Sequence, residues 1–112
     1  MKRALTSTLS LGLLLLAACG TTIGDPCTTN EQCGGQICIN QSYTPGGYCS
    51  RQCTLADPRT CPSGSVCIRD GQARDNPACF HVCRAQPDCR TGYVCKAVKD
   101  SLDAVCVGPT GL

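Results

Sequence analysis

Twelve cysteines at repeating intervals constrain this chain more than any other feature. From Cys27 to Cys106, the numbers of residues between successive cysteines are 5, 4, 10, then 3, then 7, 5, 11, then 3, then 5, 5, 10. One unit, C-x(5–7)-C-x(4–5)-C-x(10–11)-C, therefore occurs three times. A short chain this rich in cysteine is typical of exported disulfide scaffolds. We expect a small disulfide-rich fold of three tandem units, over residues 27–49, 53–79 and 83–106.

The repeat includes more than cysteine. A glycine stands three residues before the third cysteine of each unit, and a β-branched residue stands immediately before that cysteine. Glycine can take the positive φ of a tight turn, and a β-branched residue suits an extended strand. The segments CGGQIC, CPSGSVC and CRTGYVC therefore each predict a turn that leads into a strand, with Gly35, Gly64 and Gly92 as the turn glycines.

The long third gap of each unit contains turn-forming residues, which are Tyr43 to Tyr48, Asp70 to Pro77 and Lys99 to Ser101. We therefore expect one short β-hairpin between the third and fourth cysteines of each unit. The stretch after each first cysteine, such as Thr28 to Gln32, has room for one helical turn. No amphipathic helix is evident, so we expect little regular secondary structure in the units.

Large apolar side chains are scarce after residue 18. There is no tryptophan, and the aromatic residues are Tyr43, Tyr48, Phe80 and Tyr93. A chain of this kind buries little apolar area, so we expect six disulfides, each contributing about 2–4 kcal/mol, to replace an apolar core. Loops on rigid scaffolds carry recognition, which makes exposed turn residues the candidates for partner contacts: Tyr43, Tyr48, Arg74 and Phe80. Alternatively, the aromatic rings cover disulfides.

The first 18 residues have the layout of a secretory signal peptide. Lys2 and Arg3 precede an uncharged stretch, residues 4–18, that closes with two alanines. This stretch is shorter than the roughly 20 residues that span a bilayer, although an uncleaved membrane anchor is the alternative. We expect an N-terminal signal helix over residues 1–18. Removing Lys2 and Arg3 leaves eight basic residues against eight acidic ones, and this neutrality argues against nucleic acid as a partner.

The sequence Leu16 to Gly20, LAACG, resembles the lipobox of bacterial lipoproteins. The resemblance implies cleavage before Cys19, a diacylglycerol on its sulfur and usually a further acyl chain, such as palmitate, on its amine. Two or three such chains hold a protein stably to a membrane. Gly20, rather than Asp, resembles lipoproteins that are sent to the outer membrane. The number of cysteines supports the lipobox interpretation, because the chain has 13 and removing Cys19 leaves an even number. A free or bridged thiol at Cys19 is the competing interpretation.

The lipobox resemblance implies an exported, membrane-anchored lipoprotein, at the outer membrane or the cell surface. Residues 19–26 would then be the lipidated cysteine and a short polar tether. Residues 107–112 would form a tail after the last unit.

The four-cysteine unit resembles the first four cysteines of EGF-like domains, including the C-x-x-G-x-C spacing, and is similar to Dickkopf-type repeats. Four cysteines allow three pairings, and bridges between units are also open. The EGF-like resemblance implies first with third and second with fourth, although those domains add a fifth and a sixth cysteine that this unit lacks. The implied bridges are Cys27–Cys38, Cys33–Cys49, Cys53–Cys67, Cys61–Cys79, Cys83–Cys95 and Cys89–Cys106.

Catalytic and metal-binding patterns are weak in this chain. The one histidine, His81, lies in a short separator between two cysteines that the bridges need. There is no C-x-x-C redox motif, the 10- and 11-residue gaps do not fit zinc knuckles, and the aspartates lack the spacing of a calcium loop. We therefore expect no enzyme, no metal and no cofactor other than the covalent lipid on Cys19.

The sequence as a whole predicts a non-enzymatic binding or structural module at the cell envelope. Its partners would be the membrane, through the lipid anchor, and an envelope protein or glycan. The alternatives are a protease inhibitor or toxin-like effector, with Arg69 to Arg74 as a basic inhibitory loop, and an envelope redox protein.

Overall fold

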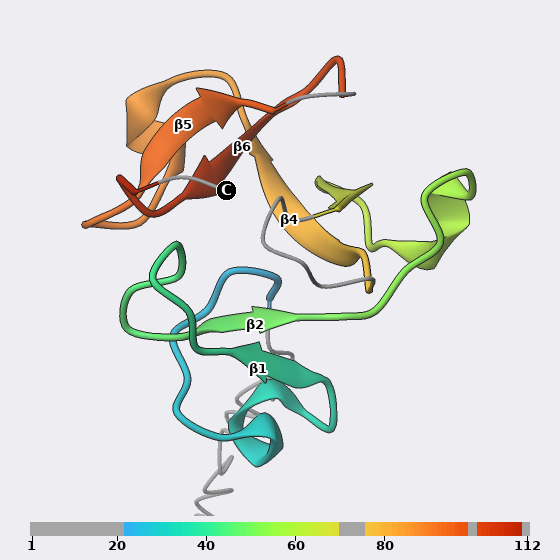
Figure 1. Ribbon diagram of the computed structural model, residues 1–112, viewed down its shortest axis with the longest axis vertical. Helices are drawn as coiled ribbons and strands as arrows, with labels where there is room; N and C mark the ends of the chain where they lie inside the picture. The colour runs from blue at the N-terminus through green and yellow to red at the C-terminus, as the bar shows by residue number, and fades with distance from the viewer. Residues whose placement is uncertain (1–21, 70–75, 99–100, 111–112) are drawn as a thin grey trace, which may run out of the picture.

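The computed structural model describes residues 22–69, 76–98 and 101–110; the expected signal helix, Cys19 and Arg74 lie outside these ranges. The described part is a small disulfide-rich fold of short strands and single 3-10 turns, as the sequence predicts (Figure 1). In chain order its elements are η1 (Asn30–Cys33), β1 (Ile37–Ile39), β2 (Tyr48–Ser50), η2 (Pro58–Thr60), β3 (Ser65–Ile68), β4 (Ala78–Cys83), η3 (Gln86–Asp88), β5 (Val94–Ala97) and β6 (Ala104–Val107).

Each unit follows the same local plan of a 3-10 turn, a tight turn and a hairpin. The tight turn is closed by a backbone hydrogen bond of 3.1 Å, for example from the Gln36 N–H to the Cys33 carbonyl. The third residue of the turn has positive φ, and it is a glycine in all three units. These glycines are Gly35 (φ 84°), Gly64 (φ 86°) and Gly92 (φ 88°).

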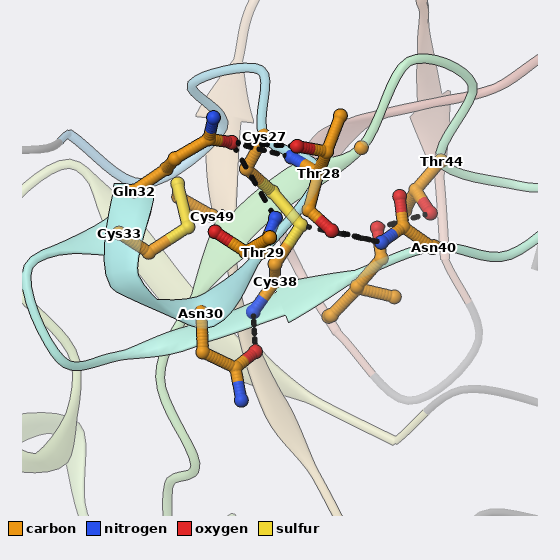
Figure 2. Close-up of a disulfide and its surroundings, with 12 residues drawn as sticks. Cys27, Thr28, Thr29, Asn30, Gln32, Cys33, Cys38, Asn40, Thr44 and Cys49 are labelled. Carbon is orange, nitrogen blue, oxygen red and sulfur yellow. Dashed lines mark hydrogen bonds between the residues drawn. A yellow bond between two sulfur atoms is a disulfide. The ribbon is translucent and has the colours of Figure 1, made fainter.

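The hairpins place the third cysteine of each unit directly opposite the fourth, as Cys38 lies opposite Cys49. Directly opposite residues project from the same face of an antiparallel pair. Each disulfide therefore ties the preceding segment, with the first two cysteines, across one face of the hairpin (Figure 2). The bridges are those that the EGF-like resemblance implies: Cys27–Cys38, Cys33–Cys49, Cys53–Cys67, Cys61–Cys79, Cys83–Cys95 and Cys89–Cys106.

The other face of each hairpin carries buried apolar residues. Residues that alternate with the cysteines face one another in pairs, such as Ile39 with Tyr48 and Val66 with Phe80. These faces pack together into one core, which also contains Tyr43 and Tyr93. The expectation that disulfides replace an apolar core is therefore wrong. Successive side chains of a strand point to opposite faces, so each hairpin can gather its apolar residues on one inward face. The overall composition gives no sign of this arrangement.

The units are fused rather than strung in a line. Strand β4 continues through the separator between units two and three and pairs with β6, which produces a four-stranded sheet in the order β3-β4-β6-β5. The β1–β2 hairpin of unit one forms a separate two-stranded sheet. It packs beside β4 with its inward face on the shared core (Figure 1).

Candidate functional site

The segment from Thr22 to Pro26, expected to be a tether, is hydrogen-bonded to unit one. The Gly24 N–H donates to the Cys49 carbonyl at 2.9 Å, and the Cys49 N–H donates to the Asp25 carbonyl at 2.8 Å. The Thr22 N–H donates to a carboxylate oxygen of Asp25 at 2.8 Å, and the Ile23 side chain packs against the core. The folded body therefore includes Thr22, five residues before the first cysteine of the repeat.

Arg90 fastens this segment to unit three. Its Nη1 donates to the Gly24 carbonyl at 2.6 Å, and its Nη2 donates to the carbonyls of Pro45 at 2.7 Å and Gly47 at 2.6 Å. The guanidinium carbon lies 4.3 Å from the centre of the Tyr93 ring, a cation–π arrangement. One half-buried side chain thus joins unit three to the N-terminal segment and to the turn of unit one.

The expected tail also contacts unit one. The Gly108 N–H donates to the Tyr43 carbonyl at 2.7 Å, and the Thr110 hydroxyl donates to the Ser42 carbonyl at 3.0 Å. A Cβ on Gly108 would stand only 2.7 Å from the Cδ of Pro45. Both ends of the described chain are therefore held against the body, next to the loop between β1 and β2.

A cavity of about 260 Å³ lies where the N-terminal segment meets units one and three. Its lining combines residues 22–26 with polar and aromatic side chains, which are Tyr48, His81, Asp88, Arg90 and Tyr93. Arg90 is engaged by three carbonyls, and Tyr48 is buried, which raises its pKa. These two groups hold the body together, and residues 22–26 form part of the cavity wall.

Asp88, which also lines this cavity, accepts hydrogen bonds from backbone N–H groups. The N–H groups of Arg84 and Ala85 donate to one of its carboxylate oxygens at 2.8 and 3.1 Å. These hydrogen bonds, that of Arg84 first, lower the pKa of the Asp88 carboxyl because they favour the charged form.

The Asp88 contact belongs to a repeated feature that sequence reasoning missed. In every unit, the side chain just before the second cysteine accepts a hydrogen bond from the N–H just after the first cysteine. Gln32 does this for Thr28 at 2.6 Å (Figure 2), Thr60 for Thr54 at 3.0 Å and Asp88 for Arg84 at 2.8 Å. The position and the oxygen acceptor are repeated but the residue type is not, so only the shared offset from the cysteines could have revealed this feature.

The aromatic residues predicted to contact a partner do not lie on the surface. Tyr43, Tyr48 and Phe80 are only 2%, 1% and 1% exposed, so their assignment as exposed contacts is wrong. Tyr48 stacks between Phe80 and Tyr93, with ring centroids 5.1 and 5.8 Å away. Its hydroxyl accepts the His81 N–H at 2.7 Å, which ties β2 to β4. The fourth candidate, Arg74, lies outside the described residues.

Three cysteine sulfurs lie within 4.8 Å of one another in each unit. All of them belong to the six disulfides and so are not thiolates, which are the form that binds zinc. These clusters reflect the packing of two bridges on one hairpin face.

No family model, curated protein or solved structure matches this chain. Within residues 22–69, 76–98 and 101–110, no helix has the length and apolar character needed to cross a membrane.

Proposed function

We propose that this chain is a lipid-anchored lipoprotein of the bacterial envelope, attached through Cys19, and that it acts as a non-enzymatic binding or structural module. One observation carries the proposal. The six disulfides use all twelve cysteines after Cys19, so none of these is left to bridge it. Its setting, LAACG after an apolar run, supplies another use for the thiol.

Export is consistent with the covalent structure of the body. Six disulfides form and persist in an oxidising compartment outside the cytoplasm, where a lipoprotein signal would deliver the chain. Gly20 after the cysteine favours the outer membrane or the cell surface as the destination.

The crosslinked body supports a role in presentation or spacing rather than catalysis. Its aromatic residues are buried in the core, so contacts with an envelope protein or glycan would use loop residues. Among the large apolar residues of the described ranges, two stand out as exposed. These are Leu55, 47% exposed in the first loop of unit two, and Leu102, fully exposed between β5 and β6.

The test is the fate of the Cys19→Ser variant, with Thr21→Ser as the matched control. Cells would be fed an alkyne analogue of palmitate, and the N-terminal peptide would be weighed by mass spectrometry. We expect Thr21→Ser to be cleaved, labelled and membrane-bound, and Cys19→Ser to be unlabelled and either unprocessed or released. A Cys19→Ser protein that remained cleaved and membrane-bound would contradict the proposal.

A thiol titration separates this role from that of an envelope redox protein. The mature protein, unfolded without reductant, should contain no free thiol, because its twelve cysteines are bridged and Cys19 carries lipid. A pair of titratable thiols would instead support the redox alternative.

A further inference from the structure

We infer that the folded body is mounted directly on the membrane surface, with the face around Thr22 to Pro26 turned toward the lipid headgroups. The inference rests on the proposed lipidation of Cys19. It adds which surface of the body meets the bilayer, and how closely.

The spacing between the anchor and the body leaves little freedom. Only Gly20 and Thr21 separate Cys19 from Thr22, which is already hydrogen-bonded to Asp25. Three Cα steps span at most about 10 Å. A leaflet's headgroup layer is about 5–7 Å thick, so Thr22 cannot rise far above it.

The segment that begins at Thr22 is fixed rather than hinged. Gly24 is bonded on both sides, since its N–H donates to Cys49 and its carbonyl accepts from Arg90. Ile23, beside it, is partly buried and packs against the core. Had the chain been free up to Cys27, the eight steps from Cys19 could have spanned roughly 27 Å. Folding of residues 22–26 removes most of that reach and fixes the direction in which the chain leaves the body.

The same geometry turns the far end of the body away from lipid. In Figure 1 the N-terminal segment, in blue, lies beside β2 near the middle of the view, whereas β5 and β6 lie at the top of it. The connection between these two strands carries the exposed Leu102. If the body is held to the membrane close to Thr22, Leu102 faces the aqueous space, where a partner could reach it.

Single tryptophans can test this orientation, because the chain contains none. Thr22→Trp reports on the proposed contact face and Leu102→Trp on the far end; both positions are exposed. Pro26→Trp is a second reporter on the same segment, in case the first does not fold. The full lipidated protein would be placed in phosphatidylethanolamine–phosphatidylglycerol vesicles in which some headgroups carry a nitroxide quencher.

We expect quenching of Thr22→Trp to be several-fold stronger than that of Leu102→Trp. Inserting a Gly-Ser linker of about ten residues after Gly20 adds roughly 17 Å of reach and should abolish most of the difference. Six disulfides by mass and an unchanged circular dichroism spectrum would confirm that each variant is folded.

Two distinct results would overturn the inference. Equal quenching at both positions in lipidated, vesicle-bound protein would mean that the body does not rest on this face, and the proposed function would stand. An N-terminal mass without lipid, together with no vesicle binding, would refute the proposed function. It would also refute the inferred orientation of the body on the membrane.

Discussion

Units two and three share one sheet, whereas the hairpin of unit one is attached by side chains and by isolated backbone hydrogen bonds, such as that from Gly108 to Tyr43. Strand β4 continues across the separator between units two and three and pairs with β6. Backbone hydrogen bonds within one sheet therefore join these two units. The β1–β2 hairpin depends on the stacked Tyr48, on Arg90 and on the buried Ser50 hydroxyl, which donates to the Cys79 carbonyl at 2.7 Å. The junction between units two and three should tolerate side-chain changes. The junction between unit one and the rest of the body, called the unit-one junction, should depend on individual residues.

Gly47→Ala should produce the largest effect, through a clash inside unit one. A Cβ there would stand 1.7 Å from the Cys27 carbonyl oxygen, and φ is already +79°. We expect a loss of at least about 3 kcal/mol in the free energy of unfolding, or failure to form the native bridges. Denaturant unfolding of the oxidised protein would measure it. The matched control is Gly64→Ala, with φ +86° but open space around its Cβ, which should cost about 1–2 kcal/mol. Equal losses would mean that the close approach at Gly47 is unimportant.

Arg90→Met should loosen unit one while leaving the four-stranded sheet intact. The change removes three hydrogen bonds from a charged donor, so we expect a loss of about 2–3 kcal/mol. Amide hydrogen exchange should accelerate at Gly24 and Cys49 and stay slow at Val105. Arg59→Met is the control, because the salt bridge of Arg59 with Asp57 is solvent-exposed and should add little to stability. Acceleration at Val105 as large as at Gly24 would show that the two junctions are not separate.

Tyr48→Phe isolates one hydrogen bond of the unit-one junction. The ring remains in the stack, but the His81 N–H loses its acceptor at a part-buried site. We expect a loss of about 1–2 kcal/mol, with faster exchange of the His81 amide. An unchanged His81 amide would indicate that water replaces the hydroxyl at this position.

Acidification should affect the first loop of unit three more than that of unit one. Hydrogen bonds from the Arg84 and Ala85 N–H groups lower the Asp88 pKa below its ordinary value of 3.8. Their contribution to stability is present above that value and is lost as the pH falls through the lower, folded-state pKa. Gln32, which plays the same part in unit one, does not titrate in this range. In an NMR titration, the Arg84 amide should shift in acid while the Thr28 amide stays constant, and Asp88→Asn should remove the response. An equal acid shift at Thr28 would contradict this.

Local features were more predictable from the sequence than the packing was. The turn glycines and hairpins follow from a cysteine frame repeated three times, so each unit supports the interpretation of the others. The inward faces could not be recognised in the same way, because strands such as Ile37–Ile39 are too short to display alternation. Residues 22–26 have turn-forming composition, typical of a linker, and only the long-range contact from Arg90 reveals that they are fixed. Gln32, Thr60 and Asp88 each accept through a side-chain oxygen but differ in residue type, so residue identity concealed the repeat.

Every disulfide lies within its own unit, and the longest spans 18 residues of sequence. Twelve cysteines can pair in about ten thousand ways, but four can pair in only three. A chain that crosses a membrane from its N-terminus can therefore complete the bridges of one unit before the next unit emerges. Oxidative folding is thus divided into three small, successive searches, and the aromatic core assembles from units that are already crosslinked.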